Sequence, residues 1–218
     1  MPQNKLSPTV EKKLAQGRAF RFMEMRAIND DEYIVEGYAT TFDDPYVLFS
    51  WDGYTVREVV DRHAFDDADM SDVIMQYDHA GRVFARLTND TLKLSVDDHG
   101  LKVRAYLGGT ELGRQVYDEI KGGYSTKMSF AFMVEKDSRV VTENHDDGSV
   151  DVLRTILKIS KTYDVSVVSL PANDGTEISA RNDGEGVIAE IRQEIAAAKA
   201  AKAEKEKLIA INNLLRSM

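Results

Sequence analysis

The sequence predicts a mainly β, antiparallel fold, a barrel or a sandwich with a few helices, on three observations. Between residues 18 and 181 the chain is a series of short β-rich runs in which apolar and polar residues alternate, the pattern of half-buried strands. Turns that contain glycine separate several of these runs, as at 97–100 and 145–148. Only two short segments in this region, 61–70 and 110–121, have a helical pattern.

The segment 110–121 has the clearer helical signals. Thr110 can accept hydrogen bonds from the first free amides of a helix. Leu112, Val116 and Ile120 follow at helical spacing, and Gly122-Gly123 ends the run. We therefore expect a short amphipathic helix here.

Composition narrows the classes of function. The 218 residues include 28 Lys+Arg and 37 Asp+Glu, a formal net charge of -9, so the surface as a whole repels phosphate and no nucleic-acid partner is expected. Because there is no cysteine, disulfides, thiolate metal sites and a cysteine nucleophile are excluded. No run approaches the roughly 20 apolar residues of a membrane span. We predict a soluble intracellular protein with no membrane partner and no cofactor.

The chain divides into three parts by composition. Residues 1–17 are polar and are predicted to form a flexible N-terminal arm. Residues 18–181 form the β domain. Residues 182–218 begin with a linker and continue as a long amphipathic helix rich in Ala, Glu, Lys and Leu. That helix either packs on its own domain or serves as a coiled-coil or assembly segment through which the chain associates with itself.

One of the four histidines has a pattern that suits chemistry. His79 ends the alternating run 72–79, which places it on one face with Val73, Met75 and Tyr77. An imidazole at the mouth of an apolar face can act as a general base, although a structural histidine has the same pattern. The other histidines lie in predicted turns or at a helix end, where a polar residue is ordinary: His63, His99 and His145.

A hydroxyl and a carboxylate complete the candidate site. In the run 127–134 the apolar residues alternate around Ser129, which therefore projects from a well-anchored strand on the other face. Asp164 is a carboxylate on an apolar strand and shares a face with Ser166, so it must be paired or lie at an edge. It could orient His79, as could Asp78. A small residue on a solvated face would explain Ser129 equally well.

Metal and phosphate signatures are weak. The sequence has no HExxH, no paired CxxC, no EF-hand spacing and no phosphate-binding glycine loop. A metal-dependent hydrolase that uses His79 with Asp78 remains an alternative, but no metal site is predicted.

Read in order, several segments resemble the prohead proteases of tailed phages, the head maturation serine proteases whose fold is similar to the herpesvirus assemblins. They are Glu36-Gly37-Tyr38-Ala39, Glu58-Val59-Val60, Asp78-His79, Asp98-His99-Gly100-Leu101, Met128-Ser129-Phe130-Ala131-Phe132 and Asp164-Val165-Ser166-Val167-Val168. Together they cover residues 18 to 181, and their order and spacing make the set specific.

The resemblance implies an assemblin-like antiparallel β-barrel followed by the long C-terminal helix. It implies a serine endopeptidase with His79, Ser129 and Asp164 as catalytic residues, although many relatives carry Glu at the third position. Its substrates would be the major capsid protein, the scaffold and its own chain, inside the assembling procapsid in the host cytoplasm. Arg139 and Arg154 are candidates to assist an oxyanion. The alternative is a non-catalytic head-assembly or scaffolding factor that acts through the C-terminal helix.

Overall fold

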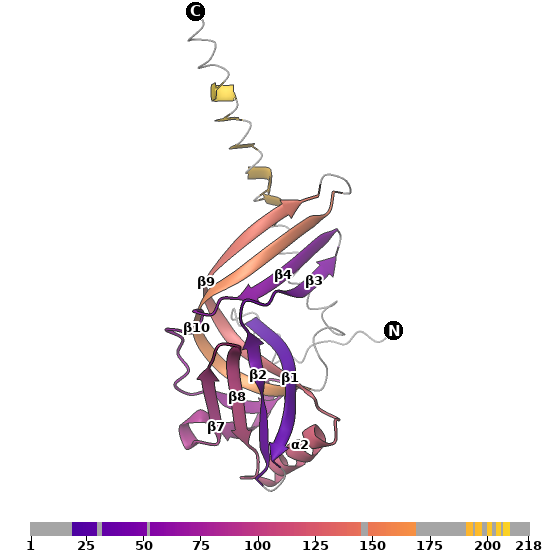
Figure 1. Cartoon of the computed structure of the whole chain (residues 1–218), viewed down its shortest axis with the longest axis vertical. Coiled ribbons are helices and arrows are strands. Elements are labelled where there is room, and N and C mark those ends of the chain that lie inside the picture. The colour runs from indigo at the N-terminus through magenta and orange to yellow at the C-terminus, as the bar shows by residue number, and fades with distance from the viewer. Residues whose placement is uncertain are drawn as a thin grey trace, which may run out of the picture. The chain divides into compact units, whose positions relative to one another are not determined.

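The computed structural model describes residues 19–29, 32–51, 53–144 and 148–168, together with short stretches between 191 and 209. Its contacts divide the chain into two units, Met1–Glu177 and Ile178–Met218. Strands dominate the first unit, as the alternating runs predict (Figure 1). The predicted limits of the arm, the β domain and the tail stay predictions, since much of both ends lies outside the described residues.

Ten strands, a 3₁₀ turn and a helix make up the described part of the first unit. In chain order they are β1 (Ala19–Asn29), β2 (Ile34–Thr41), β3 (Tyr46–Trp51), β4 (Tyr54–Val60), β5 (Ile74–Tyr77), β6 (Ala80–Arg86), η1 (Leu87–Asn89), β7 (Leu92–Val96), β8 (Gly100–Tyr106), α2 (Glu111–Lys121), β9 (Lys127–Glu143) and β10 (Val150–Val168). The strand order is β3-β4-β10-β9-β1-β2-β8-β7, and β5 pairs with β10 and β6 beside this path.

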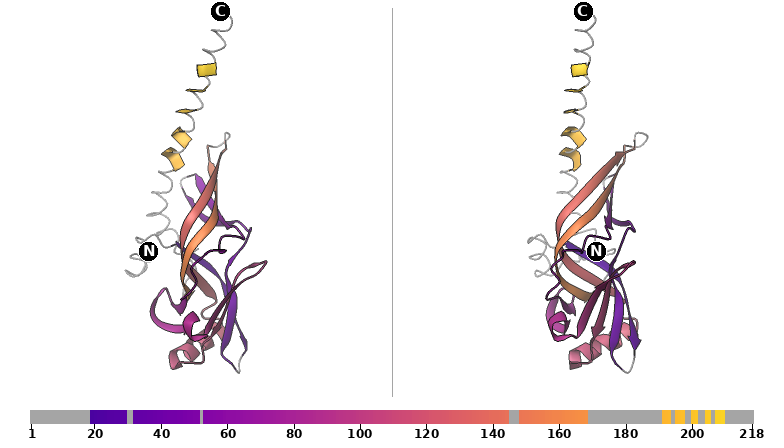
Figure 2. Two further views of the ribbon diagram at one scale, coloured as in Figure 1. Left: turned by 90° about the vertical axis from the view of Figure 1, so that its left-hand side faces the viewer. Right: turned by 60° about the vertical axis from the view of Figure 1, so that its left-hand side comes forward.

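Two long antiparallel strands, β9 with 17 residues and β10 with 19, form the backbone of the sheet. They lie side by side and curve through the whole unit (Figures 1 and 2). On its other edge β10 pairs in parallel first with β4 and then with β5. This double use of one edge brings the end of β5 beside the last residues of β10, where the candidate site lies.

The predicted closed barrel is wrong. The sheet path runs from β3 to β7, and among the described residues β3 pairs only with β4 and β7 only with β8. Closure requires the first and last strands to meet through a matched tilt and stagger. Alternation within each strand carries no information about that meeting, so the sequence pattern does not distinguish an open sheet from a barrel.

The predicted long C-terminal helix is not seen either. Residues described in this part of the chain, such as 191–193 and 207–209, are helical in short runs. The rest of 182–218 mostly lies outside the described residues. No helix in the described ranges is long and apolar enough to cross a membrane.

Some of the local predictions are confirmed and others are wrong. The helix α2 is confirmed: the Thr110 side chain accepts from the amide of Gly113, and Gly122 caps the other end. The hairpin at 97–100 is confirmed by the Asp97 amide bonding to the Gly100 carbonyl.

The predicted helix over 61–70 is wrong, because this segment is a succession of turns. Of the predicted turn at 145–148, residues 145–147 lie outside the described structure.

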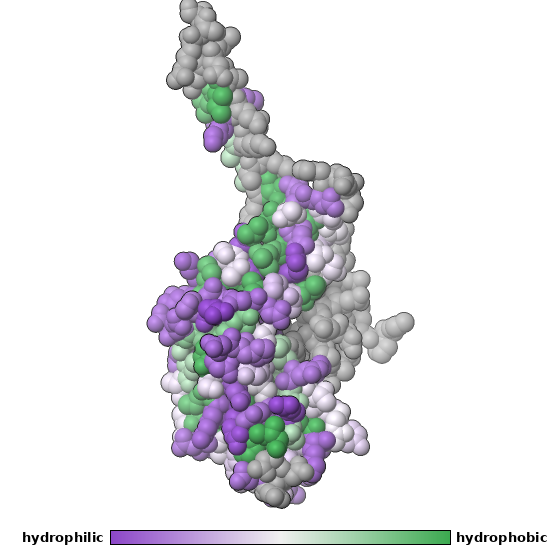
Figure 3. All heavy atoms as spheres, viewed as in Figure 1, coloured by the Kyte–Doolittle hydropathy of each residue, from purple (hydrophilic) through white to green (hydrophobic). Residues whose placement is uncertain are grey.

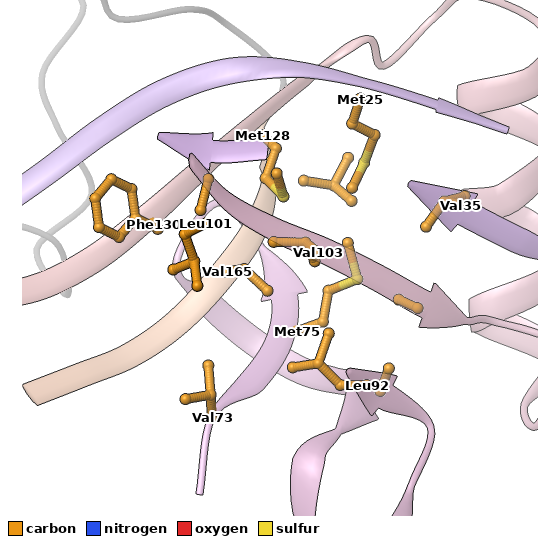
Figure 4. Packing of buried hydrophobic residues seen from close by; sticks show 14 of the residues in the cluster. Met25, Val35, Val73, Met75, Leu92, Leu101, Val103, Met128, Phe130 and Val165 are labelled. Atoms are coloured by element: carbon orange, nitrogen blue, oxygen red, sulfur yellow. The ribbon is translucent and has the colours of Figure 1, made fainter. Parts of the chain in front are cut away.

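One contiguous apolar core draws buried residues from strands that include β1, β2, β5, β8, β9 and β10. Figure 4 shows Met75, Val103, Met128 and Val165 together in this cluster, and none of them is exposed by more than a trace. Burial of such side chains is the main force that holds the strands together. The outer face seen in Figure 3 is mostly hydrophilic with smaller hydrophobic areas between.

A buried ionic cluster lies around Glu58 on β4. The Glu58 carboxylate is fully buried and accepts hydrogen bonds from Arg21, from Tyr46 at 2.5 Å and from Arg154 at 3.1 Å. Arg154 also contacts Asp137 on the neighbouring strand. The cluster therefore ties β1, β3, β9 and β10 to β4 at one point.

The charge state of Glu58 follows from these partners. Burial alone raises the pKa of a carboxyl, because it disfavours the charged form. The positive charge and hydrogen bonds of Arg21, the hydroxyl of Tyr46 and the charge of Arg154 outweigh burial and hold the pKa of Glu58 below its ordinary value. Burial and the nearby Glu58 raise the pKa of Tyr46, which therefore stays a neutral donor.

Candidate active site

Ser129 lies on β9, the strand at the middle of the sheet. As predicted, Met128 and Phe130 are fully buried on either side of it. Ser129 itself has no exposed surface, so both faces of β9 are covered here and the solvated face considered for this residue does not exist. The strand pairs with β1 at Phe22 and with β10 at Ser166. A side chain on so constrained a strand has little freedom to move.

Asp164 lies on β10, directly beside this position. The β9–β10 register pairs Asp164 with Ala131 and Ser166 with Ser129. Since side chains of directly opposed residues project from the same face of a sheet, Asp164 and Ser129 share a face and are diagonal neighbours. Asp164 is 1% exposed, so its carboxylate depends on hydrogen bonds from protein groups.

His79 comes from the β5–β6 hairpin. Strand β5 ends at Tyr77, and Tyr77 pairs with Ala80. Asp78 and His79 are therefore the two loop residues, with φ of 46° and 56°. Two positive φ values in a two-residue hairpin loop are the pattern of a type I′ turn. The prediction that His79 ends the strand is wrong in this detail, because the strand ends at Tyr77, two residues earlier than the alternation implies.

The hairpin directs the imidazole inward, where it lies between the other two side chains. His79 Nδ1 is 2.5 Å from Asp164 Oδ1, and His79 Nε2 is 2.6 Å from Ser129 Oγ. A carboxylate can only accept, so Nδ1 carries the proton that it donates to Asp164. Nε2 is then the ring acceptor and faces the Ser129 hydroxyl. All three predicted residues are thus brought together from three strands or turns far apart in the sequence.

This arrangement can transfer a proton from Ser129 to His79. The Nε2 lone pair can take the hydroxyl proton of Ser129 as its oxygen attacks a carbonyl, and the carboxylate of Asp164 stabilises the imidazolium that results. His79 is 3% exposed and Ser129 has no exposed surface. A carbonyl group can therefore reach Ser129 Oγ only after covering atoms move aside.

The structure does not bring the two arginines considered for the oxyanion to this site. Arg139 lies ten residues from Ser129 along β9, roughly 30 Å in an extended strand. Arg154, paired with Arg139 across the ladder, is bonded to Glu58 and Asp137. The backbone amides around Ser129 are engaged by strands on both sides, so they are not free to hold an oxyanion.

The remaining histidines and acids do not join the site. His63 contacts Asp66 at 3.1 Å on the surface, and the His99 ring packs on that of Tyr38. His145 lies outside the described residues. Within the described ranges no three His, Asp or Glu side chains come together in a way that could hold a metal ion. One ring nitrogen of His79 faces Asp164 and the other faces Ser129. The ring is therefore not positioned for the alternative pairing with Asp78.

Sequence reasoning missed one polar residue of the site. Ser166 is fully buried and donates a hydrogen bond of 2.7 Å to Asp164 Oδ1. The signal was available: an acid and a serine two residues apart share one face of an otherwise apolar strand. Two buried polar groups at such a short spacing are often hydrogen-bonded to each other, because each needs a partner.

A serine hydroxyl, an imidazole and a carboxylate in this order are the constellation of the Ser-His-Asp hydrolases, which recurs on unrelated folds and is recognised by its geometry. Comparison with protein families gives the particular group: the family described as caudovirus prohead serine protease matches residues 21–188. The chain therefore belongs to this family of phage serine proteases. No curated protein and no solved structure matches it significantly.

Proposed function

We propose that this chain cleaves polypeptides of the assembling phage head, inside the procapsid in the host cytoplasm, with Ser129 as nucleophile, His79 as general base and Asp164 as the residue that orients it. The family supports a protease with a role in head maturation. The observation that carries the assignment of residues is the buried imidazole with Asp164 at 2.5 Å on one nitrogen and Ser129 at 2.6 Å on the other.

The proposed reaction follows the geometry. Ser129 Oγ attacks the scissile carbonyl while His79 Nε2 takes its proton, and His79 then returns the proton to the leaving amine. The acyl group on Ser129 is released when water, deprotonated by the same nitrogen, attacks it. The two proposed substrates in the head are the major capsid protein and the scaffold, and a third is the chain itself.

Co-expression with the major capsid protein tests the assignment. The intact chain should yield shortened capsid protein, and Ser129→Ala should yield none. Removing any one residue of such a site typically lowers the rate of cleavage by several orders of magnitude. Ser50→Ala is the matched control, since Ser50 is an exposed serine bonded only to Thr55 among the described contacts. Cleavage that survives Ser129→Ala would contradict the proposal.

A fluorophosphonate probe gives a second readout that needs no substrate. It should label one serine, identified by mass spectrometry as Ser129, in the chain and in Ser50→Ala but not in Ser129→Ala or His79→Ala. Absence of labelling together with normal shell assembly would favour the non-catalytic assembly factor instead. Loss of capsid cleavage on chelation, with no probe labelling, would favour a metal-dependent hydrolase.

Self-cleavage has its own test. The purified chain and Ser129→Ala are compared by intact mass under conditions in which the chain cleaves capsid protein. Shortened products only in the chain with Ser129 would support self-cleavage, and intact termini in both would contradict it. The proposed self-association through 182–218 concerns residues that mostly lie outside the described structure, and it stays a prediction.

A further inference from the structure

Ser166 lies beside the proposed Ser-His-Asp site and is bonded to Asp164. It lies two residues after Asp164 on β10, and it is the direct cross-strand partner of Ser129 on β9. Its hydroxyl donates to Asp164 Oδ1 at 2.7 Å, and the same oxygen lies 2.5 Å from His79 Nδ1. One carboxylate oxygen thus accepts from both neighbours.

Asp164 needs a second donor for a physical reason. The terminal torsion of an aspartate is broad, so one hydrogen bond to the imidazole does not by itself fix the plane of the carboxylate. The hydroxyl of Ser166 holds the same oxygen from the strand, and Ser166 has no exposed surface through which water could replace it. The donor is therefore part of the rigid ladder that also carries Ser129.

Ser166 is not a second nucleophile in this arrangement. Its hydroxyl proton is donated to a carboxylate oxygen, whereas the hydroxyl of Ser129 is the one beside Nε2, the accepting ring nitrogen of His79. A serine whose proton is held by the acid has no base to activate it.

We infer that Ser166 is a positioning residue, which fixes the carboxylate of Asp164 and through it the orientation of His79 toward Ser129. This inference rests on the proposed function of the same site. It adds a fourth residue to the site, one that acts through its hydrogen bond to Asp164.

Three variants separate this role from simple packing. Ser166→Ala removes the donor, and Ser166→Thr keeps a hydroxyl at the same position. Thr162→Val is the matched control: Thr162 lies on the same strand, is 1% exposed, and has a hydroxyl with no hydrogen-bond partner among the described residues. Each variant is first compared with the parent chain by thermal unfolding, so that only folded proteins enter the kinetic and spectroscopic comparisons.

Kinetics of capsid cleavage give the first readout. Ser166→Ala should lower kcat by roughly tenfold, the usual worth of a hydrogen bond to a charged group, while KM changes little because substrate does not touch Ser166. Without this donor the carboxylate is a stronger acceptor for the imidazolium of His79, so the acid limb of the kcat/KM profile should move to higher pH. Ser166→Thr should recover most of kcat, and Thr162→Val should leave kcat and the limb unchanged.

Proton NMR gives a readout that does not depend on activity. In the Ser129→Ala background, the proton on His79 Nδ1 that is shared with Asp164 should give a far-downfield signal. Adding Ser166→Ala should shift or broaden that signal, and adding Thr162→Val should leave it in place. These changes would support the positioning role even if the parent chain cleaves no capsid protein, in which case the proposed function fails separately.

Three results would overturn the inference. The first is a Ser166→Ala protein with unchanged kcat, acid limb and His79 signal. The second is an equal loss in Ser166→Ala and Thr162→Val, which indicates packing. The third is a failure of Ser166→Thr to restore kcat although it folds with the stability of the parent chain.

Discussion

One oxygen atom, Oδ1 of Asp164, is the point at which the hydrogen bonds of the site meet. It accepts from His79 and from Ser166, and it lies on a strand whose neighbouring residue Val165 is fully buried. In such apolar surroundings a buried carboxylate destabilises the folded protein unless its oxygens accept hydrogen bonds. The two donors to Oδ1 offset part of that cost.

Asp164→Asn should nearly abolish cleavage while leaving the fold intact. An amide nitrogen facing Nδ1 favours the wrong ring tautomer and leaves Nε2 protonated, so we expect kcat to fall by about 10⁴, as in other sites of this geometry. Steady-state cleavage of capsid protein measures it. Asp151→Asn, an exposed ion-pair carboxylate on the same strand, is the control and should keep full activity. A loss of less than tenfold in Asp164→Asn would count against the proposed role.

The residue types of the site could be predicted because few residues can do this chemistry. With no cysteine and four histidines in the chain, only serine or threonine was expected to supply the nucleophile. The pattern made His79 and Ser129 candidates, and the family resemblance selected them. The carboxylate could not be chosen in the same way. With 37 acids present, pattern alone does not say which carboxylate meets His79.

At the scale of elements, the β5–β6 hairpin places the imidazole. Its two loop residues both have positive φ, a conformation that glycine and asparagine adopt most readily, yet Asp78 and His79 occupy them. Strain of this kind persists where the surroundings fix it and is common at functional sites. The buried hydrogen bonds of His79 supply that constraint here.

His79→Gly and His79→Ala should separate strain from chemistry. Both remove the base and should abolish cleavage. His79→Gly should be the more stable of the two, by about 1 kcal/mol, because alanine at φ 56° meets the steric penalty of the left-handed region and glycine does not. Urea unfolding of the two proteins measures the difference. Equal stability would mean that the turn relaxes once the imidazole is gone.

Close approach of two strands explains a glycine elsewhere in the sheet. A Cβ added at Gly100, where β8 begins, would lie 2.0 Å from the carbonyl oxygen of Thr40 on β2. Gly100→Ala should therefore force the strands apart and destabilise the protein by roughly 1–3 kcal/mol. Gly109→Ala is the control, since its nearest contact would be an ordinary 3.7 Å from Tyr106. Denaturant midpoints compare the two, and equal midpoints would refute the close approach.

Helices and turns were predicted with uneven success for a local reason. The helix α2 has a cap, an apolar stripe and a glycine stop within its own sequence, so nearby residues determine it. The segment 61–70 has helical spacing but folds as turns that pack Ala64 and Phe65 into the core. Tertiary packing overrides weak helical preference in so short a segment.

At the scale of the whole molecule, the cluster around Glu58 links stability to pH. The folded protein holds the pKa of Glu58 below its value in the unfolded chain. This group therefore contributes stability that is fully present above its unfolded pKa, near 4.3, and is lost as the pH falls through the lower folded value. Acid should weaken the attachment of β3 and β4 to the long strands.

Glu58→Gln tests this contribution. At pH 7 it removes the buried negative charge that Arg21 and Arg154 share and should cost about 3 kcal/mol. Between pH 6 and pH 3 its stability should fall less than that of the parent chain. Glu24→Gln removes an exposed ion pair with Lys127 and should change stability by less than about 1 kcal/mol. Urea unfolding at both pH values measures all three proteins, and parallel pH curves for the parent chain and Glu58→Gln would contradict the prediction.

The open sheet is also a property of the whole molecule. Strands β9 and β10 run well past the region where β1 and β5 pair with them, and there they carry β4 and β3 as a separate extension (Figure 1). The resemblance to a barrel-forming family therefore did not extend to the closure of this sheet.

By itself the sequence determined the properties that depend on neighbours along the chain. These are the strand-rich fold, the helix α2, the hairpin at 97–100 and the residue types that suit a serine protease. Tertiary structure alone decided the open sheet, the turn position of His79, the bond from Ser166 and the ions around Glu58. The physical reason is distance along the chain: His79 meets residues 50 and 85 positions away, and the pairing of strands between them has no signature in any short segment.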